Sequence, residues 1–206
     1  MPIIDDARVL AQELLADEWP RRWRHVVAVA ERAESLAESL AATTRDDRRA
    51  LVGAAWLHDI GYSAALADTG FHPLDGARHL RRIGFDPRVT ALVAHHSCAE
   101  AEAKLRGLGA ELRSEFPRER TIVADALCMC DFTTGPDGEP LSVTERLDEI
   151  RARYGDGHVV TRFSEIAEGD LRAAVARVTT HPDAVAAAVK KTIEVQPMYG
   201  RSRPSR

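Results

Sequence analysis

Apolar residues recur at helical spacing along nearly the whole chain, and no stretch alternates apolar and polar residues for long enough to indicate a strand. The clearest case runs from Pro20 to about Ala42, where the apolar side chains form one stripe along the segment. A helix with such a stripe is stable when the stripe is buried against another element. The sequence therefore predicts an all-α domain of about ten helices packed on one another.

Capping residues predict where these helices begin and end. The clearest are Asp5-Asp6, Pro20, Asp86-Pro87 and the Ser142/Glu145 pair at helix starts, and Gly61 at a helix end. The expected helices cover about residues 5–16, 20–42, 45–60, 74–83, 87–96, 100–113, 118–132, 142–154, 165–179 and 183–193. The run Gly135-Pro136-Asp137-Gly138 predicts a turn between two of them.

The length and composition indicate one globular domain with a sizeable core. The chain has 206 residues, of which 45% are hydrophobic and 29% are charged. We expect an N-terminal helix at 1–19, a core at 20–135, C-terminal helices packed on that core at 136–195, and a tail at 196–206. The tail contains proline and arginine but few apolar residues, so we expect it to be mobile.

Charge, cysteine content and hydropathy argue against several classes of protein. The net charge of −4 disfavours a surface for nucleic acid polymers, which would be basic. Three cysteines do not make a disulfide framework, and the N-terminus lacks the basic-then-apolar order of a signal peptide. No apolar run approaches the ~20 residues that span a bilayer. We therefore expect a cytoplasmic protein without a membrane partner, and the sequence does not indicate its oligomeric state.

His58-Asp59 is the most unusual polar feature, because it lies in the apolar run Ala54–Gly61. A buried carboxylate is costly unless a cation or several hydrogen bonds compensate it. Further candidates lie in comparably apolar helical segments: His25, His72, His95, His96 and Asp131. Helical spacing turns His25, His58 and Asp131 towards the interior from three separate helices. Imidazole and carboxylate ligands without thiolate suit Mn, Fe, Zn, Co or Mg, so the set predicts a metal centre.

Simpler interpretations compete with a metal centre. Any single core histidine could be a hydrogen-bonded structural residue, and an aspartate near a helix end is often only a cap. Their joint occurrence is harder to explain in this way, because each uncompensated buried charge costs several kcal/mol. A zinc site with Cys98, Cys128 and Cys130 is disfavoured, since Cys128 and Cys130 lie about 200° apart on a helix. His158 and His181 have turn-like surroundings and are expected at the surface.

His25, His58-Asp59 and Asp131 follow one another in the H…HD…D order of the HD-domain superfamily of metal-dependent phosphohydrolases, which the chain resembles over about residues 20–135. The apolar residues that flank His25 and His58 resemble those of the family as well. The resemblance implies an α-helical fold. The chain is most similar to small bacterial members that act on nucleotides.

The resemblance also implies a ligand set. One ion would be held by His25, His58, Asp59 and Asp131, and Asp59 would bridge to a second ion held by His72 and by His96, His95 or both. His96 is the better candidate of the two, because adjacent helical residues diverge by about 100° and Ser97 follows His96 as in the family pattern. His79 is an alternative to His72. The implied cofactor is one or two divalent metal ions, namely Fe, Mn, Zn, Co or Mg.

The chain departs from the family pattern where substrate is bound. Many members have a phosphate-binding lysine shortly after the HD pair, and Ile60-Gly61-Tyr62-Ser63 contains none. The motifs of the guanosine-tetraphosphate hydrolases and the cyclic-di-GMP phosphodiesterases are also missing, which disfavours both activities. Phosphate contacts are therefore assigned to Arg78 and Arg82, with Arg81 as an alternative. The pattern of these arginines nevertheless favours a helix face exposed to solvent over contact with the substrate.

Together these features predict a metal-dependent phosphohydrolase that cleaves a phosphate ester or anhydride of a small, nucleotide-like substrate. Asp59 is the predicted catalytic bridge, and His95, or else His79, is predicted to protonate the leaving group. Two other functions fit the same ligand set: a di-iron oxygenase of the HD fold, and a non-catalytic module that binds a nucleotide. The expected partner is a small phosphorylated molecule rather than a nucleic acid polymer.

Overall fold

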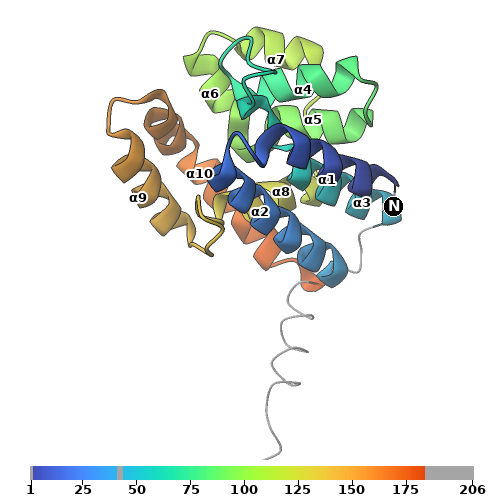
Figure 1. The fold of residues 1–206 in the computed structure, drawn as a ribbon. Helices are drawn as coiled ribbons and strands as arrows, with labels where there is room; N and C mark the ends of the chain where they lie inside the picture. The colour runs from blue at the N-terminus through green and yellow to red at the C-terminus, as the bar shows by residue number, and fades with distance from the viewer. Residues whose placement is uncertain (1, 41–43, 184–206) are drawn as a thin grey trace, which may run out of the picture.

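The computed structural model describes residues 2–40 and 44–183 and confirms the all-α prediction (Figure 1). Within these ranges the chain forms ten α-helices and two short 3-10 helices, η1 and η2. In chain order they are α1 (Pro2–Leu15), α2 (Pro20–Ser39), α3 (Arg45–Leu57), η1 (Ile60–Tyr62), α4 (His72–Arg82), α5 (Pro87–His95), η2 (His96–Cys98), α6 (Ala99–Leu105), α7 (Gly109–Glu115), α8 (Ile122–Phe132), α9 (Val143–Tyr154) and α10 (Val159–Thr179). The β-type pairing in the described ranges is limited to an isolated antiparallel bridge between Thr134 and Pro140.

Helix α3 lies in the middle of the core. It is packed by α1, α2, α5 and α8, and residues on nearly every side of it are buried: Ala50, Leu51, Val52, Gly53, Ala54, Ala55 and Leu57. A helix that is apolar all round is stable only in such a central place. His58 at its C-terminal end is fully buried, so the chain leaves α3 in the interior of the protein rather than at the surface.

The other helices surround this core on two sides. Helices α4 to α7 lie together on one side, and α9 pairs with α10 on another (Figure 1). Helix α8 joins the two parts, because Leu127 and Cys130 belong to the main core whereas Cys128 and Phe132 pack with apolar residues of α9 and α10. No helix in the described ranges is long and apolar enough to cross a bilayer.

Several predicted helix starts are confirmed together with their caps. The side chain of Asp86 accepts hydrogen bonds from the main-chain N–H groups of Arg88 and Val89 at the start of α5. Ser142 and Glu145 form a reciprocal capping box at the start of α9. These caps satisfy N–H groups that have no partner within the helix, which is why the sequence marks these ends so clearly.

Other boundaries differ from the prediction for local reasons. Asp5 and Asp6 lie inside α1, which begins at Pro2, and Gly61 lies inside η1 instead of ending α3. The single helix expected at 100–113 is two helices, because Gly107 adopts a left-handed conformation (φ 77°) between α6 and α7.

Two further starts follow from side-chain caps. Thr121 caps α8, so this helix begins at Ile122 rather than near residue 118. His158 caps α10, so this helix begins at Val159 rather than near residue 165. The helix expected at 183–193, apart from its first residue, and the tail expected at 196–206 lie outside the described residues.

Candidate metal centre

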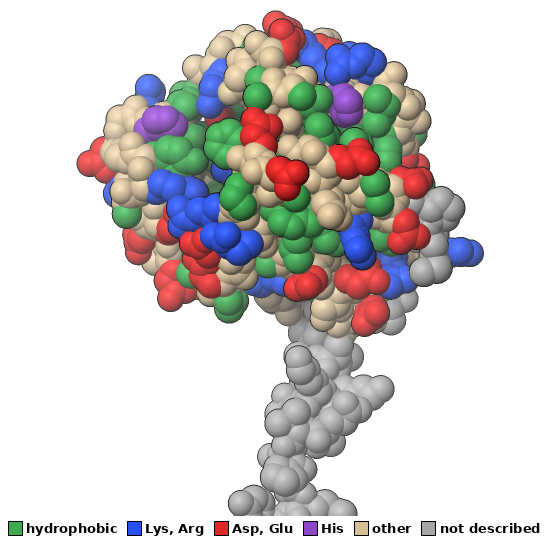
Figure 2. All heavy atoms as spheres, viewed as in Figure 1, with side chains coloured by type: hydrophobic (Ala, Val, Ile, Leu, Met, Phe, Trp, Pro, Cys, Tyr) green, Lys and Arg blue, Asp and Glu red, His purple; other side chains and the backbone are tan. Residues whose placement is uncertain are grey.

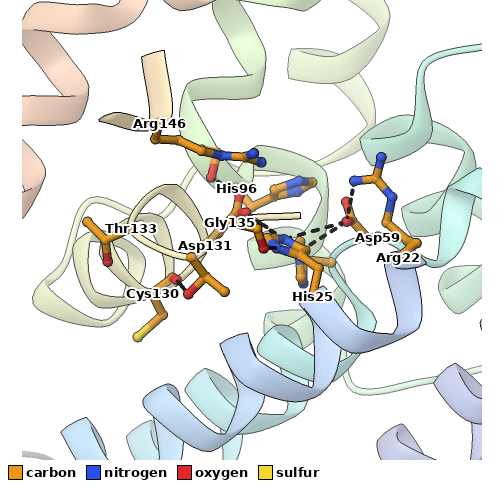
Figure 3. Close-up of polar contacts among 12 residues, drawn as sticks. Arg22, His25, Asp59, His96, Cys130, Asp131, Thr133, Gly135 and Arg146 are labelled. Atoms are coloured by element: carbon orange, nitrogen blue, oxygen red, sulfur yellow. Dashed lines mark hydrogen bonds and ion pairs between the residues drawn. The ribbon is translucent and has the colours of Figure 1, made fainter. Parts of the chain in front are cut away.

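Six of the predicted ligands meet in the interior, where α2, α4 and α8 approach the C-terminal end of α3. They form two groups, one of His25, His58 and Asp131 and one of Asp59, His72 and His96. In each group the ligand atoms lie within 4.8 Å of one another. Figure 3 shows His25, Asp59, His96 and Asp131 converging from separate elements. The structure therefore brings together residues that are up to about a hundred positions apart in the sequence.

Asp59 lies between the two groups. Its Oδ2 atom is 3.4 Å from His58 Nε2 and 3.9 Å from His25 Nε2, both in the first group. Its Oδ1 atom is 3.3 Å from Nε2 of His72 in the second group. The carboxylate is only 3% exposed, so it is held in this position by its neighbours. One oxygen faces each group, which is the arrangement that a bridging carboxylate requires.

Three of the histidines are oriented by main-chain carbonyl groups. The Nδ1 atoms of His25, His58 and His96 lie 3.0, 2.8 and 2.7 Å from the carbonyl oxygens of Gly135, Ala55 and Val93, respectively. A carbonyl oxygen only accepts, so Nδ1 carries the hydrogen in each ring. The lone pair is then on Nε2, which faces the centre of the site. Metal-ligating histidines are held in this way in known metal sites.

The contacts between Nε2 atoms indicate that a cation is needed. Nε2 of His25 lies 3.4 Å from Nε2 of His58 and 3.1 Å from Asp131 Oδ1. In the second group, Nε2 of His72 lies 3.2 Å from Nε2 of His96. Two facing lone pairs repel each other unless a proton or a metal ion lies between them. The donor set of imidazole nitrogens and carboxylate oxygens therefore fits divalent metal ions.

The electrostatics of the site lead to the same conclusion. Burial by itself lowers the pKa of His58, but the carboxylates of Asp59 and Asp131 raise it to about 9. Burial would raise the pKa of each aspartate, but the histidines around them, and Arg22 beside Asp59, hold both pKa values well below their usual range. Burial and the neighbouring imidazoles lower the pKa of His96 to about 4. At neutral pH and before a metal ion binds, the site thus presents two carboxylates, a neutral His96 and a His58 that carries the compensating proton.

Arg22 is a site residue that the sequence reasoning missed. It donates a hydrogen bond from Nη1 to Asp59 Oδ2 at 2.8 Å, as Figure 3 shows. Its guanidinium group lies over the ring of Tyr62, 3.9 Å from the ring centre. The ring of Tyr62 also stacks on the ring of His72, a ligand of the second group. Arg22 precedes His25 by one helical turn of α2, and this spacing is the only sequence feature that points to it.

The chain turns sharply after α5, and this turn separates His96 from His95. Ser97 and Cys98 both adopt left-handed conformations (φ 46° and 59°), and the hydroxyl of Ser97 donates to Asp131 Oδ2. His96 reaches the second group, whereas Nε2 of His95 donates to the carbonyl oxygen of Phe116 at 3.0 Å. This placement supports the preference for His96. His95 belongs to neither metal-capable group, so the structure gives no support to its predicted roles as an alternative ligand and as the acid that protonates the leaving group.

The predicted phosphate contacts of α4 are not supported by the structure either. Arg78 is bound by the carboxylates of Glu111 and Glu115, and Nη2 of Arg82 lies 3.0 Å from His79 Nδ1. None of the three α4 residues lines the cavity beside the metal groups. The polar face of α4 is turned towards α7 and solvent. This agrees with the alternative interpretation, in which Arg78 and Arg82 belong to a solvated helix face.

The remaining candidates lie elsewhere. All three cysteines are free thiols, and neither of the two metal-capable groups found in the described residues contains one. His158 is exposed and caps α10, as expected for a surface residue. His181 lies 3.6 Å from Asp183 Oδ2 near the end of the described chain. The zinc alternative is therefore not favoured by the structure.

Comparison with known proteins agrees with this geometry. The family model of the HD domain matches residues 22–131, a range that contains all six converging ligands and agrees with the resemblance predicted for about 20–135. No curated protein and no solved structure matches the chain. The family match spans just over half of the 206 residues. The protein therefore belongs to the HD domain family.

Proposed function

We propose that the protein is a metal-dependent phosphohydrolase that cleaves a phosphate ester or anhydride of a small, nucleotide-like molecule. The observation that carries this proposal is the position of Asp59, with one carboxylate oxygen towards each histidine group. Divalent ions in these groups would polarise phosphoryl oxygens and lower the pKa of a water molecule. Fe, Mn, Zn, Co and Mg remain candidates, since imidazole and carboxylate ligands suit each of them.

The chain's own residues hold and orient the site. His25, His58 and Asp131 would hold one ion and Asp59, His72 and His96 the other. The main-chain carbonyl groups behind three of the histidines keep their rings from rotating. Arg22 donates to Asp59 Oδ2, which leaves Oδ1 directed towards His72. A ligand set that is oriented before an ion or a substrate arrives reduces the reorganisation needed during the reaction.

The cavity beside the second group supports a phosphorylated substrate. It is lined by metal-group residues and by three arginines, Arg22, Arg146 and Arg153. Arginine suits phosphate oxygens because its planar guanidinium group donates two parallel hydrogen bonds. The same positive charge disfavours a basic partner. We propose a small phosphorylated molecule as the substrate, in place of a nucleic acid polymer.

The proposal is tested with protein purified without chelator. Its metal content is measured, and phosphate release is assayed with each of the five metals on p-nitrophenyl phosphate and on nucleoside mono-, di- and triphosphates. We expect turnover that falls by at least the order of 100-fold in Asp59→Asn, because this change affects both groups. An Arg151→Gln protein is the control, since Arg151 is an exposed residue of α9.

Three outcomes would contradict the proposal. Iron in both groups with oxygen consumption and no phosphate release would instead identify a di-iron oxygenase. Tight binding of a nucleotide without turnover under any of the five metals would identify a binding module. Full activity in Asp59→Asn would show that the two groups are not the reaction centre.

A further inference from the structure

The cavity at the metal groups is completed by helices that lie outside the family match. The match ends at residue 131, and α9 and α10 follow it. Arg146, Arg153 and Tyr154 of α9 and Val160 and Phe163 at the start of α10 line the cavity. The two helices also share an apolar cluster with Phe132 of α8, which fixes them against the helix that carries Asp131. The part of the chain beyond the match therefore contributes to the site.

Arg146 is buried there with an unused donor. Its side chain is 8% exposed, and its Nη1 atom donates to Glu149 Oε2 at 2.5 Å. Its Nε atom is buried and has no hydrogen-bond partner among the described residues. Figure 3 shows the guanidinium group of Arg146 extending towards the side of the site where His96 and Asp131 lie. A buried donor without an acceptor is unfavourable unless a ligand supplies that acceptor.

Arg146 shares its acid with a second arginine. Arg153 Nε lies 3.1 Å from Glu149 Oε1, so one carboxylate serves two guanidinium groups. Burial and repulsion from Arg146 and Arg22 lower the pKa of Arg153, which indicates that three cations face the same space. Arg22 is already bound to Asp59. Glu102 also lines the cavity, but Arg106 already binds its carboxylate, so the α9 pair carries a surplus of positive charge next to the metal groups.

Two arginines outside the cavity each have more than one acid beside them. Arg88 contacts two acids, Asp47 and Glu119, and Arg78 contacts at least two as well. Basic and acidic side chains lie beside one another over the face shown in Figure 2. The arginine-rich composition alone thus does not explain an unbalanced pair in a cavity. A ligand with negative charge does explain it.

We propose that Arg146 and Arg153 form an anion receptor that binds a terminal phosphate group of the substrate beside the metal ions. A terminal phosphate carries two negative charges near neutral pH and offers three oxygens, which suits two guanidinium groups that share one acid. An internal phosphodiester carries one charge and fits this surplus less well. The substrate class is then a phosphomonoester or a chain that ends in phosphate. This inference rests on the proposed function, because it places the phosphate at the same metal groups.

Binding of inorganic phosphate tests the receptor directly. The full chain is loaded with metal, and phosphate binding is measured by calorimetry for the wild type and for Arg146→Gln and Arg153→Gln. We expect binding about tenfold weaker in each variant, with metal content unchanged, because a charge-assisted hydrogen bond is lost. Arg151→Gln, on the same helix but exposed and paired with Glu165, is expected to bind as the wild type does. Unchanged binding in both variants would overturn the proposal.

One further variant and one further anion complete the test. Arg146→Lys retains the charge but loses the planar guanidinium group with its paired donors. Its affinity for phosphate is therefore expected to lie between those of the wild type and Arg146→Gln. If Arg146→Gln fails to fold, as its melting curve would show, Arg153→Gln and Arg146→Lys decide the question. Dimethyl phosphate, which has one charge, is expected to bind more weakly than phosphate. Equal binding of the two anions would overturn the assignment to a terminal phosphate.

The same measurements separate this inference from the proposed function. Phosphate binding that depends on both arginines, without hydrolysis of any phosphate ester or anhydride, would support the receptor and reject the hydrolase. Hydrolysis with the same KM for phosphomonoesters in the wild type, Arg146→Gln and Arg153→Gln would support the hydrolase and reject the receptor. Nucleoside monophosphates and sugar phosphates, assayed side by side, identify which organic group the terminal phosphate belongs to.

Discussion

His25 Nδ1 donates a hydrogen bond to the main-chain carbonyl oxygen of Gly135 at 3.0 Å, which links α2 to a turn 110 residues further along the chain. The turn follows α8, the helix that carries Asp131, so one segment both supplies a ligand and orients another. Arg32 of α2 strengthens this link, because it donates to the carbonyl oxygen of Thr133 at 2.6 Å and to its hydroxyl at 2.8 Å. The first metal group therefore depends on how α2 is fastened to the 133–135 segment.

Arg32→Gln is expected to destabilise the protein by about 1–3 kcal/mol, because the Thr133 carbonyl loses a charged donor. It should also weaken metal binding to the first group by up to the order of tenfold, since His25 becomes less well oriented. Arg24→Gln is the matched control. Arg24 lies on the same helix and pairs with Asp137 of the same turn, but both side chains are about half exposed, and such pairs contribute about 0–1 kcal/mol.

Urea denaturation and competition with a metal chelator measure the two effects. Equal losses in Arg32→Gln and Arg24→Gln would show that the turn is fastened by general charge attraction and not by the Thr133 contacts.

Gly61→Ala is expected to displace His72. A Cβ atom at Gly61 would lie 2.0 Å from the main-chain oxygen of His72 and 2.8 Å from the main-chain nitrogen of Gly76, so the start of α4 must move. Crowding of this kind costs about 1–3 kcal/mol or more. We expect one metal ion to be lost, the one held by the second group, with the first group still filled. Elemental analysis and thermal denaturation check both effects.

Gly169→Ala serves as the control for this substitution. Gly169 is exposed within α10, and a Cβ atom there has no neighbour within 4 Å. Alanine is therefore expected to stabilise the helix by about 0.5–1 kcal/mol. A Gly61→Ala protein that retains both ions and full stability would mean that η1 and α4 tolerate a wider separation.

The fold could be predicted because local patterns and tertiary packing agree. Asp86 and Ser142 mark helix starts through contacts within the next turn, which are visible in the sequence. The converging ligands could be predicted for a related reason. Each one is a polar residue in or beside an apolar helical segment, and a shared cation explains the burial of all of them together.

Two features of the site were harder to predict from the sequence. One is the choice between His95 and His96, and the other is which arginines supply positive charge to the cavity. Helix α5 ends at His95, and His96 has an extended backbone (ψ 154°) ahead of left-handed Ser97 and Cys98, a conformation that these residue types do not indicate. Arg146 and Arg153 lie on an amphipathic helix, where arginine is typical of the solvated face. Arg146 is buried and Arg153 lines the cavity because α9 packs beside residues far away in the sequence, which no local pattern records.

Ser97 allows backbone strain and hydrogen bonding to be separated. Its hydroxyl donates to Asp131 Oδ2, and its φ of 46° is unfavourable for any residue with a Cβ atom. Ser97→Ala and Ser97→Gly both lose the hydrogen bond, so both should bind metal about tenfold more weakly at the first group. The glycine variant should be about 1 kcal/mol more stable than the alanine variant, because it relieves the strain. Equal stabilities would show that the left-handed turn carries no strain.

The ion pairs of Arg88 with Asp47 and Glu119 predict that the free energy of unfolding depends on pH for a reason outside the metal site. Arg88 donates two hydrogen bonds to the carboxylate of Glu119, at 2.9 and 2.7 Å, and this contact lowers the pKa of Glu119 despite partial burial. A carboxylate with a lowered folded-state pKa stabilises the protein above its unfolded-state pKa of 4.5, and the stabilisation is lost as pH falls through the lower folded-state value.

Glu119→Gln is therefore expected to be about 1 kcal/mol less stable than the wild type at pH 7, and the difference should shrink steadily below pH 4.5. Urea midpoints of the metal-free proteins at pH 7, 5 and 4 measure this trend. Glu165→Gln is the control, because Glu165 pairs with Arg151 where both side chains are about half exposed. If the stability difference for Glu119→Gln does not change between pH 7 and pH 4, the glutamine destabilises the protein through altered packing and not through the loss of the negative charge.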